Sequence, residues 1–333
     1  MPLLEVRGLS THFFIRQGRL RAVDHVSFHI EQGETLALVG ESGCGKSVTA
    51  ASILRLIPDP PGRIVGGEIW FEGRDLLTLS INDMRALRGN RIGMIFQEPM
   101  TSLNPVFTIG DQITEVIREH QAVSRAQAES RAAELLNLVR VPDPHRQLRE
   151  YPHRLSGGMR QRVMIAIALA CDPALLIADE PTTALDVTTQ AQILELLDDL
   201  KRRLGMAMLL ITHDLGVVAR VAQRVLVMYA GRVVEAAGVA DLFRNPLHPY
   251  TRGLLNSLPR PDREVDAAGR PAPLTEISGI VPSLAALPPG CAFAPRCPHA
   301  IDDCRRSDME LEVFPNDRAA ACLRVRELQR GAT

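Results

Sequence analysis

The sequence predicts an α/β fold built around a parallel sheet that is covered by helices. An apolar segment of strand length, residues 36–39, leads into a glycine-rich loop and then into a helical stretch from Val48 to Leu56. Two later segments, residues 174–179 (ALLIAD) and 206–212 (MAMLLIT), are continuously apolar, as strands buried on both faces are. Strands of this kind that alternate with helices are typical of a parallel sheet.

The N-terminal residues predict a second, smaller sheet. Residues 3–35 alternate apolar and polar positions, as strands with one buried face do. They include Phe13 and Phe14, of which an exposed one could stack on a purine base, while a core role for one of them is equally open. Residues 58–67 (PDPPGRIVGG) are rich in Pro and Gly and are expected to form a loop, and residues 68–76 return to a strand and turn.

The loop after the first apolar strand has the spacing of a phosphate-binding loop. It reads G-x-x-x-x-G-K-S from Gly40 to Ser47, and its glycines allow successive backbone N–H groups to turn around an anion. Lys46 would reach the β- and γ-phosphates, and Ser47 would give a hydroxyl ligand to Mg²⁺. A nucleoside triphosphate is therefore the expected ligand. Its contacts within the loop are expected to come from Gly40, Glu41, Ser42, Gly43, Cys44, Gly45, Lys46, Ser47 and Val48.

A helical insertion is expected to interrupt the core at about residues 98–172. Residues 91–97 predict a short strand that ends at Gln97, and residues 98–105 (EPMTSLNP) predict a loop. Helical apolar spacing then runs over residues 109–139 and 159–171. After the insertion the core is expected to comprise the strand at 174–179, a helix at 189–204 stopped by Gly205, the strand at 206–212 and a strand pair that turns at Ala230 and Gly231.

Four polar side chains follow predicted strands and supply the chemistry of triphosphate hydrolysis. Asp179, at the carboxyl end of a buried strand, is expected to hold Mg²⁺, and Glu180 to polarise the attacking water. Gln97 and His213 could reach the γ-phosphate from different sides, with Gln97 also a candidate Mg²⁺ ligand, although either alone would be an ordinary loop residue.

A second anion-binding turn lies at residues 155–162 (LSGGMRQR). Ser156, Gly157 and Gly158 precede a helix start, where N–H groups and a hydroxyl can hold an anion. Because one nucleotide rarely needs two such turns from one chain, this one is expected to close over the nucleotide of a partner chain.

The residues beyond 258 differ in composition from the rest of the chain. Pro and Gly are frequent from 259 to 290, and the last four cysteines, Cys291, Cys297, Cys304 and Cys322, follow. We expect a catalytic domain at 1–257 and a small cysteine-rich extension at 258–333, joined by a linker. In a reducing compartment such cysteines favour a metal site over disulfides. Structural zinc, with His299 as a further candidate ligand, an iron–sulfur cluster and four unconnected buried thiols all remain open.

The motifs together resemble the ATP-binding cassette (ABC) proteins over residues 3 to about 240. The resemblance implies a P-loop ATPase core with an antiparallel β subdomain and a helical subdomain, ATP and Mg²⁺ as ligands, adenine stacking on Phe13 or alternatively Phe14, and a further site residue, Asp186, in the segment ALD at 184–186. It also implies that the region after Gln97 receives a helix of a membrane subunit.

A narrower resemblance is carried by residues 155–194, by HPYTRGLLNSLP at 248–259 and by GCAFAPRCPHAIDDC at 290–304. These look like the ATPase subunits of bacterial dipeptide, oligopeptide and nickel importers. The resemblance implies two membrane permease subunits, a second and non-identical ATPase subunit, an extracytoplasmic solute-binding protein, and a [4Fe-4S] cluster on the four cysteines that holds the tail together. Cys44 stands where the family usually has Ser, and its neighbours suggest a reactive thiolate, with a buried inert thiol as the alternative.

Composition restricts the remaining alternatives. The net charge of −1 and the 4% of aromatic residues do not fit a nucleic-acid-binding surface, which argues against a soluble cassette ATPase acting on nucleic acid. The longest apolar runs fall well short of the roughly eighteen residues that span a bilayer, and the start lacks a secretory pattern. We therefore expect a peripheral protein on the cytoplasmic face of the cell membrane that powers import of peptides or related small solutes.

Overall fold

A computed structural model describes the chain except for residues 17, 98–101, 184, 259–275 and 331–333. The strands are β1 (Leu4–Ile15), β2 (Gly18–Ile30), β3 (Thr35–Val39), β4 (Gly62–Phe71), β5 (Arg74–Asp75), β6 (Ile92–Ile95), β7 (Leu175–Asp179), β8 (Ala207–Thr212), β9 (Arg224–Tyr229), β10 (Arg232–Gly238), β11 (Glu312–Phe314) and β12 (Arg318–Ala320). The helices are α1 (Lys46–Ile53), α2 (Ile81–Leu87), α4 (Ile109–His120), α5 (Arg125–Leu138), α6 (Pro144–Gln147), α7 (Gly157–Ala168), α8 (Val187–Leu204), α9 (Leu215–Val221), α10 (Val239–Arg244), α11 (Pro249–Asn256) and α12 (Val325–Arg330).

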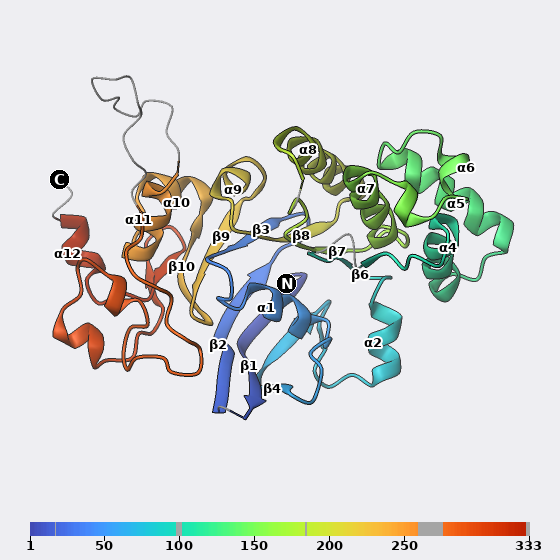
Figure 1. Ribbon diagram of the computed structural model, residues 1–333. Helices are drawn as coiled ribbons and strands as arrows, with labels where there is room; N and C mark the ends of the chain where they lie inside the picture. Colours follow the sequence, from blue (N-terminus) through green and yellow to red (C-terminus); the bar gives the residue numbers. More distant parts are fainter. Residues whose placement is uncertain (17, 98–101, 184, 259–275, 331–333) are drawn as a thin grey trace, which may run out of the picture.

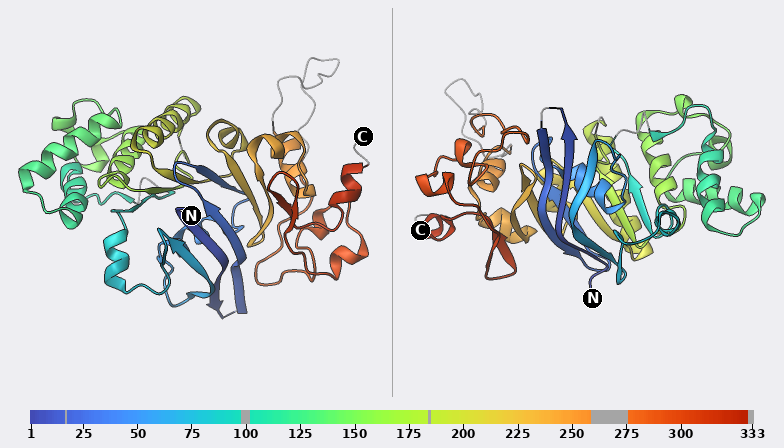
Figure 2. Two further views of the ribbon diagram at one scale, coloured as in Figure 1. Left: turned by 180° about the vertical axis from the view of Figure 1, so that it is seen from behind. Right: turned by 90° about the horizontal axis from the view of Figure 1, so that it is seen from below.

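Two sheets form the centre of the molecule. The larger has the order β11-β12-β10-β9-β3-β8-β7-β6, and the smaller has the order β2-β1-β4-β5. The helical region α4–α7 and the C-terminal residues lie at opposite ends, with the sheets between them (Figure 1 and Figure 2). No helix in the described ranges is long and apolar enough to cross a membrane.

The parallel part of the larger sheet confirms the predicted core strands. β3, β7 and β8 are buried at every position, and β3 sends alternate side chains into two different apolar clusters, as a strand covered on both faces does. The register pairs Val39 with Thr212 and Asp179 with Ile211. The carboxyl ends of these three strands therefore meet at one edge of the sheet.

The smaller sheet corrects one prediction. Residues 62–67, expected in a loop, belong to β4, which pairs antiparallel with β1 from Phe13↔Gly62 to Leu4↔Phe71. The glycines of this segment suggested a loop, but in the structure Gly62 lies against Phe13 of β1. A Cβ at Gly62 would come within 2.9 Å of the Phe13 ring. Glycine at this position therefore permits the close approach of the two strands rather than breaking the strand.

The helical region also differs in detail from the prediction. The apolar spacing over 109–139 corresponds to two helices, because Ser124 and Gln127 form a capping box that starts α5. α7 begins at Gly157, two residues before the expected start, since Ser156 caps it by accepting a hydrogen bond from the Met159 N–H. The first four residues of the loop expected at 98–105 lie outside the described residues.

The C-terminal residues join the main sheet. β12 pairs antiparallel with β10, and β11 pairs with β12, so that the larger sheet continues into the last part of the chain. Phe293 packs in the same apolar cluster as Tyr229 of β9 and Tyr250 of α11. Residues 259–275, the first part of the Pro- and Gly-rich stretch in which the linker was expected, lie outside the described residues.

Candidate active site

The loop between β3 and α1 has the backbone of an anion cradle. Gly40 and Gly45 have φ values of 155° and 106°, in the region that favours glycine. A Cβ at Gly40 would lie 2.3 Å from the Met228 carbonyl oxygen, and one at Gly45 would lie 2.2 Å from that of Ala22. Both glycines are therefore required by space as well as by conformation. α1 starts directly after this loop, which directs its positive end toward the loop.

Lys46 and Ser47 connect this loop to the neighbouring strand. The buried Lys46 Nζ donates to the carbonyl oxygens of Gly40 at 2.8 Å and Glu41 at 3.1 Å, which holds its charge over the loop. Ser47 Oγ donates to Asp179 Oδ1 at 3.1 Å. The structure thus brings a hydroxyl and a carboxylate together as hard oxygen ligands of the kind that Mg²⁺ prefers. Burial and the neighbouring charge of Glu180 raise the pKa of Asp179, although Ser47 and Lys46 act in the opposite direction.

Glu180 is the centre of a second set of contacts. Its carboxylate accepts hydrogen bonds from Gln97 Nε2 at 3.2 Å and Thr183 Oγ1 at 2.9 Å, and it lies 3.3 Å from His213 Nδ1. Three residues predicted from separate strand ends, Gln97, Glu180 and His213, are therefore brought together. Burial alone would raise the pKa of Glu180, but the hydrogen bonds from Thr183 and His213 and the charge of Lys46 outweigh it, so the pKa is lowered. The carboxylate is thus favoured in its ionised form.

The backbone at Glu180 is also unusual. Its φ is 46°, a left-handed conformation that a residue with a side chain seldom adopts. Its N–H donates to the Ile211 carbonyl oxygen at 2.9 Å, and its carbonyl oxygen accepts from the Thr183 N–H at 3.1 Å. These bonds hold the turn after β7, so that Asp179 and Glu180 project in different directions. Sequence reasoning missed Thr183, although its place three residues after Glu180 is a turn spacing.

The turn at 156–158 lies apart from the phosphate loop of its own chain. No hydrogen bond among the described residues joins Ser156, Gly157 or Gly158 to residues 40–47. Instead the glycines approach the start of α8: a Cβ at Gly158 would lie 2.9 Å from Thr189 Cγ2. Asp186 caps α8 by accepting from the Thr189 N–H at 2.9 Å. Ala184 is outside the described residues.

The two aromatic candidates for base stacking differ in exposure. Phe13 is partly buried and packs beside Gly62, whereas 52% of Phe14 is exposed. Stacking of adenine on Phe13, or alternatively on Phe14, stays a prediction.

The buried environment of Cys44 contradicts the expectation that its thiol is a reactive thiolate. Only 1% of the residue is exposed, and it packs in the apolar cluster beneath the smaller sheet. Burial raises the pKa of the Cys44 thiol even though Lys46 acts in the opposite direction. The neutral thiol is therefore the favoured form.

The four C-terminal cysteines line one small cavity but do not form a ready-made site for a single ion. Cys291, Cys297, Cys304 and Cys322 all contribute to its wall, together with His299. Within the described ranges, no group of three or more His, Cys, Asp or Glu side chains could hold a metal ion. The structure therefore gives no support to the expected zinc or iron–sulfur site beyond the shared cavity.

Comparisons with known proteins agree with this geometry. Residues 23–183 match the family model described as "ABC transporter", and residues 234–304 match the model described as "Oligopeptide/dipeptide transporter, C-terminal region". The chain is 59% identical over 326 residues to "Probable peptide ABC transporter ATP-binding protein y4tR" of Sinorhizobium fredii, covering 98% of this chain and 96% of the relative. It is 55% identical over 325 residues to "Oligopeptide transport ATP-binding protein AppD" of Bacillus subtilis, covering 98% and 97%.

Solved structures show the same fold. The dimeric structure of MJ0796, a bacterial ABC transporter cassette, superposes with a TM-score of 0.64 at 28% identity and covers 71% of this chain and 98% of its own. A dimeric post-hydrolysis state of the same cassette, bound to ADP and Pi, gives a TM-score of 0.64 at 27% identity with the same coverage.

Proposed function

Because this chain belongs to the family of ABC transporter ATP-binding proteins, and is therefore an ATPase, we propose that it energises the import of peptides through a membrane complex. The observation that carries the proposal is the similarity to peptide and oligopeptide transport proteins along 98% of the chain, with the match at 234–304 to the C-terminal region of that group. Nickel is the alternative cargo.

The test is transport by the complete complex. The chain would be co-expressed with candidate permease subunits and a candidate solute-binding protein of the same organism, and the complex would be reconstituted into vesicles. We expect ATP-dependent uptake of a labelled tripeptide and stimulation of ATP hydrolysis by the loaded binding protein. Uptake of Ni²⁺ without peptide uptake would overturn the peptide assignment. Failure of the chain to associate with these permease subunits would overturn the role in transport.

We further propose roles for the residues of the site. Lys46 and the N–H groups of residues 40–47 would bind the phosphates, and Ser47 with Asp179 would hold Mg²⁺, which neutralises charge on the phosphates when bound. The ionised Glu180 would accept a proton from the attacking water. Gln97 and His213, which contact Glu180, would also contact the γ-phosphate, so that their positions would depend on whether it is bound.

The turn at Ser156 is proposed to complete the nucleotide site of a partner ATPase subunit. Ser156, Gly157 and Asp186 are exposed, and 84% of Val187, which follows Asp186, is exposed as well. A partner that covers these residues would bury the valine and receive the turn. We propose a non-identical ATPase partner and two permease subunits that hold the chain at the cytoplasmic face of the membrane.

A [4Fe-4S] cluster on Cys291, Cys297, Cys304 and Cys322 remains a proposal. Its support is that the four thiols line a common cavity and that four cysteine thiolates are the usual ligands of such a cluster. Anaerobically purified protein should then be brown and contain about four irons per chain by metal analysis. Zinc without iron would replace the cluster by a zinc site, and protein with neither metal would exclude both.

A further inference from the structure

The C-terminal extension, residues 276–330, reaches the phosphate-binding loop through one arginine. Arg296 Nη1 donates to Glu41 Oε2 at 2.7 Å, and its Nη2 donates to Glu41 Oε1 at 3.0 Å. Only 4% of the Arg296 side chain is exposed. Its other hydrogen bonds go to the carbonyl oxygens of Ser278 and Ile277 and to the Tyr229 hydroxyl. This is a bidentate, shielded ion pair between residues 255 positions apart in the chain.

A second contact reaches the same residue of the loop. The Glu41 N–H donates to the Tyr250 hydroxyl at 2.9 Å. Tyr250 is fully buried and packs edge-on against Tyr229 with ring centroids 4.7 Å apart, while Phe293 of the extension lies 5.4 Å from Tyr250. The extension therefore fixes Glu41 at its carboxylate, directly through Arg296, and at its N–H, indirectly through the Tyr250 ring that Phe293 supports.

Glu41 passes this constraint on to the phosphate site. Its carbonyl oxygen accepts from Lys46 Nζ at 3.1 Å and from the Cys44 N–H at 3.3 Å. The orientation of the Glu41 peptide thus helps to set the position of the Lys46 ammonium group and the curvature of the loop.

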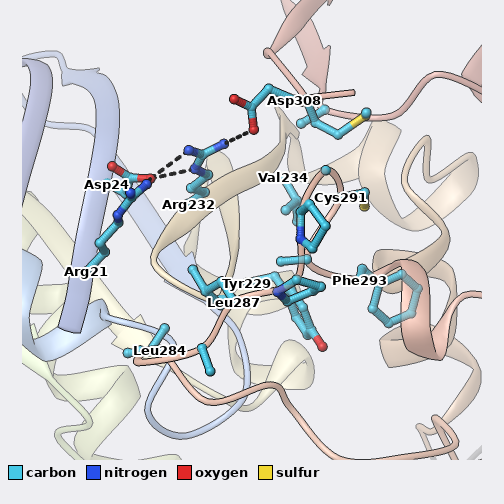
Figure 3. Close-up of a pocket in the computed structure, with 18 of the residues that line it drawn as sticks. Arg21, Asp24, Tyr229, Arg232, Val234, Leu284, Leu287, Cys291, Phe293 and Asp308 are labelled. Atoms are coloured by element: carbon cyan, nitrogen blue, oxygen red, sulfur yellow. Dashed lines mark hydrogen bonds and ion pairs between the residues drawn. The ribbon is translucent and has the colours of Figure 1, made fainter. Parts of the chain in front are cut away.

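A cavity lies beside these contacts, between the extension and the ATPase core. It has a volume of about 400 Å³ and separates Leu284 and Leu287 of the extension from Arg21 and Asp24 of β2 (Figure 3). Tyr229 and Phe293 line one side of it. Around this cavity the extension is held to the core by the pairing of β12 with β10 and by the contacts of Arg296 and Phe293.

We propose that Arg296 is a positioning residue of the nucleotide site, which acts through Glu41 to hold the phosphate-binding loop in its binding conformation. The C-terminal extension thereby sets the affinity of this subunit for nucleotide. This inference rests on the ATPase activity of the family and is independent of which solute is imported.

The cysteines frame this contact. Arg296 lies in the loop between Cys291 and Cys297, where the Ala294 N–H donates to the Cys291 carbonyl oxygen at 3.0 Å and the Cys297 N–H donates to that of Ala294 at 3.3 Å. From the sequence, a cluster on the four cysteines was expected to hold the tail together, outside every hydrolysis motif. The structure instead joins the tail to the phosphate loop, so that the geometry of this cysteine loop bears on nucleotide affinity.

The test measures nucleotide affinity and turnover separately. Full-length wild type, Arg296→Gln and Arg296→Lys would be titrated with MgATP by calorimetry, and kcat and KM would be measured in the assembled complex. If loss of the ion pair leaves about one tenth of the molecules with a competent loop, Kd and KM rise about ten-fold while kcat is nearly unchanged. Lysine keeps the charge without the bidentate geometry, so Arg296→Lys should fall between the other two.

Two further variants distinguish an effect on nucleotide binding from an effect on folding. Arg305→Gln removes an exposed arginine of the same extension and should leave Kd unchanged. Tyr250→Phe removes the other contact to Glu41 and should weaken binding in the same direction. A lowered melting temperature with MgATP affinity within two-fold of wild type, in the folded Arg296 and Tyr250 variants, would mean a structural role only and would overturn the proposal.

Discussion

The carboxylate of Glu180 is held by neighbours from three separate segments, with Gln97, Thr183 and His213 all within 3.3 Å of it. Hydrogen bonds of this kind fix its direction and keep it ionised, as a base for water must be. Its left-handed backbone turns it away from the adjacent Asp179, which faces Ser47. Two neighbouring acids can therefore serve the metal and the water separately.

Replacement of Glu180 by Gln should separate binding from hydrolysis. The amide keeps the size of the side chain but cannot accept the proton, so turnover should fall at least about 100-fold while MgATP still binds. Single-turnover hydrolysis and calorimetric titration would measure the two effects. Lys46→Ala is the contrasting variant, because it removes a charge from the phosphates in the ground state and should weaken MgATP binding itself. Near-normal turnover in Glu180→Gln would show that another group activates the water.

At Cys44 the buried environment predicts low reactivity. A thiol that is 1% exposed, with a pKa raised by burial, should react slowly with maleimide at neutral pH. Mass spectrometry after brief treatment should find Cys44 unmodified in the folded chain, with or without MgATP, and modified after unfolding in urea. Rapid labelling of the folded chain that MgATP prevents would instead restore the idea of a reactive thiol in the loop.

At the scale of single elements, the stability of the fold should depend on pH through His248, the N-cap residue of α11. His248 is 1% exposed, its Nδ1 accepts from the Tyr250 N–H, and burial lowers its pKa to about 3. The unfolded chain, with a histidine pKa near 6.5, therefore binds more protons than the folded chain below that pH. The contribution of the neutral His248 to the free energy of unfolding is thus fully present above about pH 6.5 and is lost as the pH is lowered toward 3.

The variant His248→Gln tests this sign. Between pH 7.5 and 5.5 the wild type should lose about 1 kcal/mol more unfolding free energy than the variant, because glutamine does not titrate. Urea unfolding at the two pH values would measure the difference. Glu235, whose pKa is raised by burial, contributes with the opposite sign but is common to both proteins. Equal losses in the two proteins would show that His248 does not carry the dependence.

The elements that sequence reasoning found are those specified by local patterns. The continuous apolar strands, the loop from Gly40 to Ser47 and the Gly205 stop of α8, where φ is 63°, each depend on neighbours within a few positions. The missed elements depend on distant partners. β12 has three residues and gains its stability from pairing with β10, and β4 includes glycines because β1 approaches closely there. The pair Arg296 and Glu41 has no local signal at all.

At the scale of the whole molecule, the phosphate loop and the turn at Ser156, which we propose to serve two different nucleotide sites, lie apart. The phosphate loop and Glu180 lie at the edge formed by β3, β7 and β8, whereas the turn at Ser156 starts α7 and has no hydrogen bond to that loop in the described part of the chain. Within a dimer, every complete site would therefore combine the loop of one subunit with the turn of the other.

This arrangement predicts the outcome of mixing two inactive variants. In Ser156→Arg the bulky cation would block the turn that a partner receives, and in Glu180→Gln the loop side would be inactive. If two copies of this chain paired, a mixed dimer would contain one site with both defects and one site with neither. In a complex that lacks the other ATPase, such a mixed dimer would hydrolyse ATP at about half the rate of a wild-type dimer.

We propose a non-identical partner, and therefore expect no restoration when differently tagged variants are purified together. Recovered ATP hydrolysis in the doubly tagged fraction would show instead that the chain pairs with itself. Ser156→Arg alone, assembled with its partner ATPase, should leave MgATP binding to this chain unchanged and remove hydrolysis at the partner's site, because the turn acts in trans.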